Sequence, residues 1–276
     1  MAHTGFSFYR PCRQLAPYVR HYWVLKEEQT MNALTFPVGC PMLLFHKKSP
    51  CYIPELNRFQ DRLTVSGQVN FPAHLHSKGD LEMIAVVFRP HAIGLFLGMP
   101  ASLLYNLEVS GRDIGNKGLE ELAEKVFLCA DERGCISIIE QWLLSQAAAD
   151  LPDRGLTALN LRRTETAINA ILANPSASVS ELSSATCLCN KQFGRIFNDL
   201  VGMNPKEYAQ IVRFHKVLSI IQEGGSSNEE WGAMAYRCGY SDQSHFIREF
   251  KRFSGHTPAS FPHAEASYSD LFTEPA

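Results

Sequence analysis

A pattern of aromatic residues, glycine and proline occurs twice in the C-terminal half of this chain. In the second copy the pattern comprises Phe246, Phe250, Gly255, Pro258 and Phe261. In the first copy, 53 residues earlier in every case, it comprises Phe193, Phe197, Gly202, Pro205 and Tyr208. Similarity at a fixed spacing is the signature of a duplicated structural unit. The C-terminal half is therefore predicted to fold as two similar units.

Each copy of the pattern predicts a helix–turn–helix unit. Two aromatic residues four positions apart share one face of a helix, and a glycine followed by a proline ends that helix. These signals place the second helix of each unit at residues 190–200 and 242–253. The first helices are expected at residues 179–186 and 229–237, and the turn of the second unit is one residue longer.

The second unit carries the turn and cap residues that such a motif needs. Gly239 can adopt the positive φ of a tight turn, and either Ser241 or Asp242 can cap the following helix. The polar face of that helix carries glutamine and arginine, which bind adenine and guanine edges in the major groove of DNA. A solvated surface helix is the alternative, since charged faces are common. The duplication favours the DNA-binding interpretation.

The polar faces of the two second helices supply the candidates for contact with DNA. Base-edge contacts are expected from Lys191, Gln192, Arg195, Gln243, Ser244 and Arg248. Phosphate contacts, which position a protein without reading sequence, are expected from Lys206, Lys251 and Arg252. His245 is compatible with a DNA contact and with a role in packing. The residues expected in the core are Phe193, Ile196, Phe197, Trp231, Phe246 and Phe250.

A long helix is predicted between the two units. Asn204 can cap it, Pro205 suits its first position, and Glu207 can return a hydrogen bond to the cap residue. The helix should run to about residue 222, before a break at Gly224–Asn228. Its inward-facing residues are expected to be Tyr208, Ile211, Val212, Leu218 and Ile221. Because successive major-groove segments on one face of DNA lie about 34 Å apart, one chain with such a spacer can read two of them.

Residues 238–258 read CGYSDQSHFIREFKRFSGHTP, which is close to the signature of AraC/XylS-type bacterial transcription regulators. The resemblance extends over both copies, from about Arg163 to Phe261. It implies an all-α domain in which two helix–turn–helix units bind double-stranded promoter DNA. It also implies RNA polymerase as a partner, with activation more common than repression.

The first copy departs from the family's pattern more than the second. Cys187 stands where the family usually has glycine; if its φ is positive, the Cβ costs about 1–2 kcal/mol. Cys189 replaces the usual capping serine, so Asn190 is expected to cap instead. Gly194 stands where the family often has a base-contacting side chain. In the second copy, Pro262 stands where an arginine is common. We therefore expect the second unit to supply more of the sequence specificity.

The N-terminal half has the pattern of a small β-rich domain. Runs of β-branched and aromatic residues between glycines and prolines predict strands at residues 18–25, 42–46, 63–67 and 81–88. Two amphipathic helices are expected at about 117–130 and 134–148. The predicted fold is thus an α+β N-terminal domain, a small barrel or sandwich with helices, followed by an all-α domain.

Residues 10–113 also resemble an uncharacterised N-terminal domain found in one branch of AraC-type regulators. The similar segments are Leu15–Arg20, Pro37–Gly39, Phe88–Pro90 and Gly98–Ala101. The resemblance brings no known ligand with it, so a small-molecule effector is expected without being identified. The apolar stripes of the two helices fit either a second copy of the chain or their own domain, and a homodimer therefore stays open.

A second function class rests on Gly67, His74, His76 and Glu82, whose order loosely matches the metal-binding motif of cupins. His74 and His76 would share a face if they lay on a strand. Pro72 and the polar run after His76 instead favour a loop with surface histidines, so no metal or other cofactor is expected. The alternative is a small-molecule- or metal-binding β-barrel, with any catalysis at these histidines, that carries an appended DNA-binding domain. We expect no catalytic residues and therefore no enzyme.

Composition and charge divide the chain into three parts. Residues 1–154 form the predicted sensory or dimerisation domain. Residues 155–262, which start with a predicted helix at 164–173, form the DNA-binding domain and hold 11 basic and 9 acidic residues. Residues 263–276 hold three acidic residues and no lysine or arginine, which indicates a flexible tail. The net charge of −2 therefore conceals a mildly basic DNA-binding part.

The expected location is the cytoplasm, without contact to a membrane. No apolar run approaches the roughly 18 residues needed to span a bilayer, and the first residues lack the apolar core of a signal peptide. In a reducing compartment the eight cysteines are expected to be free thiols. Cys187 and Cys189 are interpreted as small turn residues, with a redox or metal role as the alternative.

Overall fold

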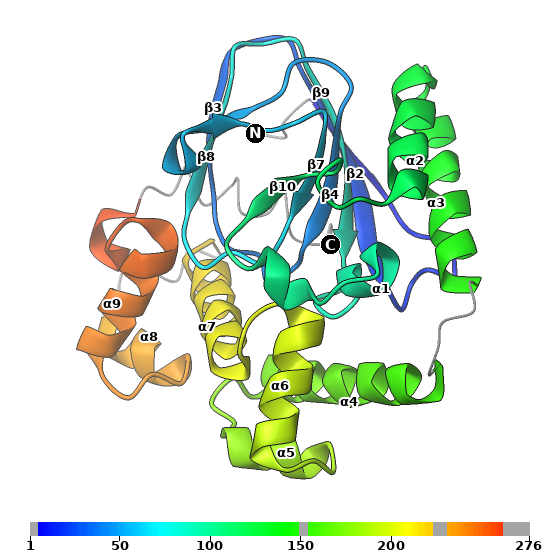
Figure 1. Cartoon of the computed structure of the whole chain (residues 1–276). Helices are drawn as coiled ribbons and strands as arrows, with labels where there is room; N and C mark the ends of the chain where they lie inside the picture. The colour runs from blue at the N-terminus through cyan, green and yellow to red at the C-terminus, as the bar shows by residue number, and fades with distance from the viewer. Residues whose placement is uncertain (1–4, 149–153, 223–230, 262–276) are drawn as a thin grey trace.

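The computed structural model describes residues 5–148, 154–222 and 231–261. The predicted acidic tail and the predicted break at Gly224–Asn228 lie outside these residues. In the described part, the strands belong to the N-terminal half and helices make up the C-terminal half (Figure 1). The predicted order of an α+β part followed by an all-α part is confirmed.

The strands form two antiparallel sheets. The six-stranded sheet contains, in spatial order, β1 (Phe6–Tyr9), β2 (Val19–Glu27), β9 (Leu81–Phe88), β4 (Met42–His46), β7 (Leu63–Ser66) and β10 (Glu108–Ser110). The four-stranded sheet contains β3 (Met31–Thr35), β8 (Ala73–Ser77), β5 (Tyr52–Ile53) and β6 (Arg58–Phe59). The strands predicted from the sequence are β2, β4, β7 and β9, which form the centre of the larger sheet.

The central strands are buried on both faces. Along β2, Tyr22 and Val24 pack toward the helices that cover the sheet, whereas Trp23 and Leu25 point into the layer between the two sheets. Successive side chains of a strand point to opposite faces, and here both faces are covered. This is why β2 and β9 are nearly continuous apolar runs rather than alternating sequences.

Two helices, α2 (Lys117–Leu128) and α3 (Glu132–Ala148), cover the outer face of the six-stranded sheet (Figure 1). Asn116 caps α2, since its Oδ1 accepts a hydrogen bond from the backbone N–H of Leu119 at 3.1 Å. The stripe that the helices bury comprises Leu119, Leu122, Val126, Ile136, Ile139 and Leu143. Of the two arrangements that the sequence allowed, the structure shows these stripes packed onto their own half of the chain. The short helices α1 (Ile93–Leu97) and η2 (Ala101–Leu104) lie at the end of the same half.

The helices of the C-terminal half follow the predicted order. They are α4 (Arg154–Ala173), α5 (Val179–Ala185), α6 (Asn190–Val201), α7 (Pro205–Gln222), α8 (Trp231–Arg237), α9 (Gln243–Ser254) and η3 (Pro258–Ser260). The predicted helix at 164–173 is too short, because α4 begins at Arg154. Residues 155–163 of α4 are exposed or half-buried, so no apolar stripe marks them in the sequence. None of the helices in the described part combines the length and apolar character that crossing a membrane requires.

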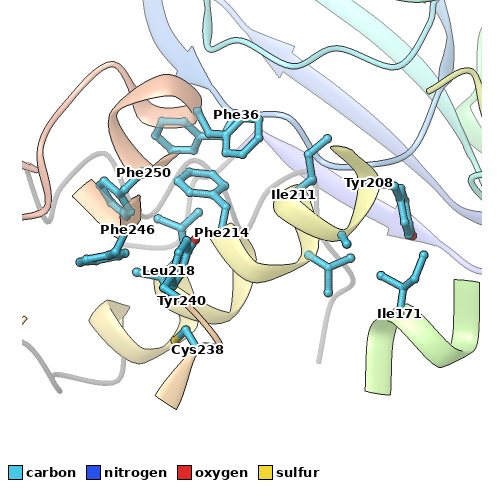
Figure 2. Close-up of a cluster of buried hydrophobic side chains, with 14 of the residues drawn as sticks. Phe36, Ile171, Tyr208, Ile211, Phe214, Leu218, Cys238, Tyr240, Phe246 and Phe250 are labelled. Atoms are coloured by element: carbon cyan, nitrogen blue, oxygen red, sulfur yellow. The ribbon is translucent and has the colours of Figure 1, made fainter. Parts of the chain in front are cut away.

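One apolar core serves both helix–turn–helix units. Figure 2 shows the part of it around α7 and the second unit. Phe214 of α7 packs against the second unit, with its ring 5.4 Å from that of Phe250 and 5.5 Å from that of Phe253. Of the predicted core residues, the four phenylalanines are buried, whereas Ile196 and Trp231 are partly buried. The inward-facing residues predicted for α7 are all buried, namely Tyr208, Ile211, Val212, Leu218 and Ile221.

The predicted loop around the histidine pair is wrong. Residues 73–77 form β8, which pairs with β3 so that Leu34 lies opposite His74 and Ala33 opposite Leu75. Pro72 comes directly before the strand, where its missing N–H breaks no ladder hydrogen bond. The strands β5, β6 and β10 span only two or three residues each. Such lengths are too short for an alternating pattern to be recognised in a sequence.

Candidate nucleic-acid interface

The second helix–turn–helix unit consists of α8 and α9, joined by a turn at Gly239. The φ of Gly239 is 82°, and a Cβ at this position would lie 2.4 Å from Oγ of Ser176. Both conformation and contact therefore require glycine. Asp242 caps α9, because its Oδ1 accepts the backbone N–H of His245 at 2.7 Å. That hydrogen bond holds the pKa of the Asp242 carboxyl below its usual value.

The first unit, α5 and α6, has the same plan with less favourable turn residues. Cys187 has a φ of 54°, so the strain anticipated for a Cβ here, about 1–2 kcal/mol, applies. Cys189 is the N-cap of α6 and makes no side-chain cap hydrogen bond. The prediction that Asn190 caps this helix is wrong, because Asn190 is already its first residue. Its Oδ1 instead accepts a hydrogen bond from Oγ of Ser183 at 2.6 Å, which ties α6 back to α5.

The side chains predicted to contact DNA all lie on the surface. Those on α6 are Lys191, Gln192 and Arg195, and that at the start of α7 is Lys206. Those on α9 are Gln243, Ser244, Arg248, Lys251 and Arg252. The opposite faces of α6 and α9 carry the buried phenylalanines. Each second helix therefore presents one polar face to solvent, as an element that enters a DNA groove must.

Both second helices contact the N-terminal half through their C-terminal ends. α6 ends at Gly202, where a Cβ would lie 2.9 Å from the backbone oxygen of Ala101. α9 ends at Gly255, where a Cβ would lie 3.7 Å from Cγ of Pro72. The first turns of both helices remain exposed. Helix–turn–helix proteins contact base edges with the N-terminal residues of the second helix, and in the described part of this chain these ends are exposed.

A polar bridge centred on Glu207 ties the second unit to α7 and to the N-terminal half. Its Oε1 accepts from Nη2 of Arg252 at 2.7 Å and from Nδ2 of Asn70 at 2.6 Å. Burial acts to raise the pKa of Glu207, but hydrogen bonds from Tyr105, Asn70 and Arg252 outweigh burial and lower it. Asn204 caps α7 as predicted, with its Oδ1 2.9 Å from the backbone nitrogen of Glu207. The carboxylate of Glu207, however, serves the bridge.

A buried ion pair in the second unit was not predicted from the sequence. Glu249 of α9 is only 3% exposed, and Arg213 of α7 donates to it through Nη2 at 3.0 Å and Nε at 3.3 Å. Nε2 of His245 lies 3.5 Å from the same carboxylate, which places His245 in the packing of this contact. The first unit has Ile196 at the position of Glu249. The missed signal was a charge three residues after Phe246, on the apolar face of the helix.

A cleft of about 490 Å³ lies between the N-terminal half and helices α4 and α7. Arg20, Arg89 and Lys216 line it, together with Glu165. His91 also lines the cleft and is 5% exposed, and its Nδ1 has no partner in the described part of the chain. Burial, with a smaller contribution from the charge of Arg89, lowers the pKa of His91 to about 4. This set of cationic side chains suits a small anionic molecule.

The histidines of the alternative metal site lie on the outer side of β8. Leu75, between them, points into the cavity between the two sheets, whereas His76 is exposed and His74 partly so. Nδ1 of His74 lies 2.6 Å from Oε1 of Glu55, and Glu82 forms an ion pair with Lys47 at 3.4 Å. Within the described ranges, no group of three histidine, cysteine, aspartate or glutamate side chains is placed to hold a metal ion.

Two helix–turn–helix units that share one core and are joined by one long helix define a class of two-unit DNA-binding proteins. Residues 182–263 match a family model described as a helix-turn-helix domain. Residues 7–110 match a family model described as a domain of unknown function, DUF6597. Both resemblances inferred from the sequence are therefore confirmed, that of the C-terminal part to AraC/XylS-type transcription regulators and that of the N-terminal part to an uncharacterised domain.

Two curated relatives are named as transcriptional regulators. The chain is 26% identical over 166 residues to an uncharacterized HTH-type transcriptional regulator of Haemophilus influenzae, a match that covers 59% of this chain and 51% of the relative. It is 32% identical over 84 residues to the probable transcriptional regulator LumQ of Photobacterium leiognathi, covering 30% of this chain and 33% of the relative. The matches thus span about half and about a third of the relatives' lengths. Among solved structures, ToxT of Vibrio cholerae is 10% identical over 98% of both chains, with a TM-score of 0.42.

Proposed function

We propose that the chain is a sequence-specific DNA-binding regulator that reads two successive major-groove segments with α6 and α9. The observation that carries this proposal is that both helices are held at their C-terminal ends while their first turns stay exposed. The 18 residues of α7 lie between the two units (Figure 1). A helix of that length spans about 27 Å, comparable to the roughly 34 Å between major-groove segments on one face of DNA.

The proposed base-reading residues are those on the exposed first turns and the adjacent polar face. They are Lys191, Gln192 and Arg195 of α6, and Gln243, Ser244 and Arg248 of α9. Lys206, Lys251 and Arg252 are the proposed phosphate contacts. Arg252 donates to Glu207 through Nη2, and its side chain is 42% exposed. A guanidinium has five N–H donors, so Arg252 can bind Glu207 and a phosphate at the same time.

Selection of binding sites from random DNA tests this proposal. We expect an enriched site with two conserved segments about one helical turn apart, both protected when the selected fragment is footprinted. Binding that weakens steeply with salt but selects no sequence would show phosphate contact alone and would contradict the proposal. Enrichment of a single segment would contradict the role of the second reading helix.

Activation of transcription and contact with RNA polymerase are proposed on the family resemblance. Under this proposal residues 1–154 form the sensory or dimerisation domain, residues 155–262 form the DNA-binding domain, and the protein acts in the bacterial cytoplasm. Transcription with purified polymerase from a promoter carrying the selected site should increase when the protein is added. A decrease would assign the protein to repression. The mass of the protein in solution, measured by light scattering, decides whether it forms a homodimer.

The cleft between the N-terminal half and helices α4 and α7 is the proposed binding site of a small anionic effector. The cationic side chains support this proposal, as does Nδ1 of His91, which has no partner among the residues that the structure describes. Benzoate and inorganic phosphate are suitable probes for calorimetric titration. We expect Lys216→Ala to weaken binding of the responding probe, whereas Lys125→Ala on α2 leaves it unchanged. Equal loss with both variants would indicate nonspecific attraction and remove the cleft from consideration.

A further inference from the structure

The residues Phe36–Cys40, here called the coupling segment, connect β3 to β4 and touch both halves of the molecule. Val38, Gly39 and Cys40 line the cavity of about 80 Å³ between the two sheets. The same three residues also line the cleft of about 490 Å³ that faces α4 and α7. The coupling segment is therefore the wall that the cavity and the cleft share. A molecule in either space contacts it.

One end of the coupling segment is part of the DNA-binding half. Phe36 is 4% exposed and belongs to the core of the two helix–turn–helix units, although it comes from the β-rich half. Its ring centroid lies 5.8 Å from that of Phe214 (Figure 2). The distance to the ring centroid of Phe261 is 5.7 Å. Phe214 also contacts Phe250 of α9. A shift of Phe36 would therefore act on the residues that hold the second reading helix.

The backbone of the coupling segment is bonded on both sides. Nε2 of His215, on α7, lies 2.7 Å from the carbonyl oxygen of Pro37. Nε2 of Gln68, on the side of the β-rich half, donates to the carbonyl oxygen of Gly39 at 3.0 Å. Gly39 has a φ of 68°, and a Cβ there would lie 3.2 Å from Cε2 of Tyr208 on α7. Packed interfaces of this kind adopt alternative arrangements rather than deforming gradually.

We infer that the coupling segment transmits occupancy of the cleft to α7, and so sets the relative position of the two reading helices. This inference rests on the proposed function, since it assumes that an effector occupies the cleft and that both helices read DNA. The coupling segment suits this role for three reasons. It lines the cleft, and the carbonyl oxygen of Pro37 bonds to His215 of α7. Phe36 inserts its ring into the core of the two helix–turn–helix units.

Hydrogen exchange in the intact protein tests the physical link without any ligand or DNA. Phe36→Leu keeps a buried apolar side chain but removes the aromatic contacts with Phe214 and Phe261. We expect amide exchange in α7 to accelerate by about fivefold or more, because local openings there lose contacts. The matched control is Phe45→Leu, which removes a buried phenylalanine that faces α2 on the other side of the sheet. The control should accelerate exchange around α2 and leave α7 unchanged.

A bulky side chain introduced into the wall of the cleft tests whether the coupling segment affects DNA binding. Val38→Trp adds bulk to the shared wall without the need to know the effector. We expect it to change the affinity for the selected two-segment DNA by about fivefold or more. In the presence of Phe36→Ala, the same Val38→Trp substitution should change affinity by less than about twofold. A purely structural role for Phe36 would leave the effect of Val38→Trp intact.

The outcomes separate this inference from the proposed function. If no selected DNA site exists, the proposed function fails, while the exchange experiment still reports on the link to α7. If Phe36→Leu accelerates exchange only within the coupling segment, the inference is overturned even when DNA binding is confirmed. Equal effects of Val38→Trp with and without Phe36→Ala would also overturn it. Accelerated exchange in α7 together with the loss of the Val38→Trp effect supports it.

Discussion

The two helix–turn–helix units follow one backbone plan but hold their second helices by different means. In the first unit the turn contains Cys187 at a φ of 54°, and α6 has no side-chain cap. In the second unit the turn contains Gly239, and Asp242 caps α9. The second unit also has the buried pair of Arg213 and Glu249. Polar and strained features thus differ while the pairs of buried phenylalanines stay the same.

The buried phenylalanine pairs are common to both units, whereas the cap of the second helix and the buried ion pair are found in the second unit. Phe193 and Phe197 are as deeply buried as Phe246 and Phe250. Burial of apolar area is non-directional and large, so it tolerates a poor turn. A cap or an ion pair is directional, and it fixes the orientation of a helix more closely. The second unit is therefore expected to hold its reading helix more rigidly than the first.

The largest difference between the units should appear when Arg213 is truncated. Arg213→Ala leaves the Glu249 carboxylate buried without its partner, and such losses cost about 3–5 kcal/mol. The equivalent position of Glu249 in the first unit is Ile196, and Ile196→Val should cost only about 0.5–1.5 kcal/mol. Urea unfolding of both variants measures the difference. Equal losses of unfolding free energy in the two variants would show that the Arg213–Glu249 pair stabilises the second unit no more than Ile196 stabilises the first.

DNA reading should be more sensitive to the second unit than to the first. Arg248→Ala is expected to lower affinity for the selected site by about 1–3 kcal/mol and to relax one base position. Arg195→Ala on α6 should have a smaller effect, because that helix is uncapped and carries Gly194 within its polar face. Competition binding against random DNA gives both numbers. An equal loss on specific and random DNA would assign Arg248 to phosphate contact.

Exchanging the turn residues should affect stability in opposite directions. Cys187→Gly removes the strain of a Cβ at positive φ and should stabilise the protein by about 1 kcal/mol. Gly239→Ala adds that strain and also brings a Cβ against Ser176, so it should destabilise the protein by more. Thermal unfolding of the two variants measures both changes. Destabilisation by Cys187→Gly would mean that its side chain contributes more than its backbone strain costs.

The smallest expected effect is the loss, at acid pH, of the hydrogen bond with which Asp242 caps α9. The folded-state pKa of Asp242 is lowered, so the contribution of this cap is present above the unfolded pKa of about 3.9 and is lost as pH falls through the folded value. The amide resonance of His245 should therefore shift as pH falls below about 4. Gln192 occupies the equivalent position in α6, whose N-cap is Cys189, and should show no such shift. Parallel shifts of the two amides would indicate general unfolding in acid.

The sequence predicted those elements of the fold that depend on local periodicity. The phenylalanine pairs, the turn glycines and the cap at Asn204 identified α5 to α9 close to their observed bounds, because helix signals act within a few residues. The central strands β2, β4, β7 and β9 were predicted because they are long or strongly apolar. The strand that carries His74 was missed, since its flanking proline and polar residues imitate a loop.

Local periodicity also predicted which side chains of the candidate interface are exposed. Exposed side chains on one helical face, such as Arg195 and Arg248, follow directly from spacing. Which of them have partners does not follow. Arg252 forms an ion pair with Glu207, and the side chain of Glu249 is only 3% exposed. His245, which the sequence left between two roles, lies beside Glu249.

The duplicated unit, its apolar face and the long helix that joins the two copies follow from local sequence. Each of these depends on residues a few positions apart, whose relation is set by helix geometry alone. How the β-rich half meets α6 and α9 depends instead on tertiary packing. Asn70 and Glu207 are 137 residues apart, and Pro37 and His215 are 178 apart. Contacts between such distant residues depend on how whole elements pack, and no local pattern in the chain encodes them.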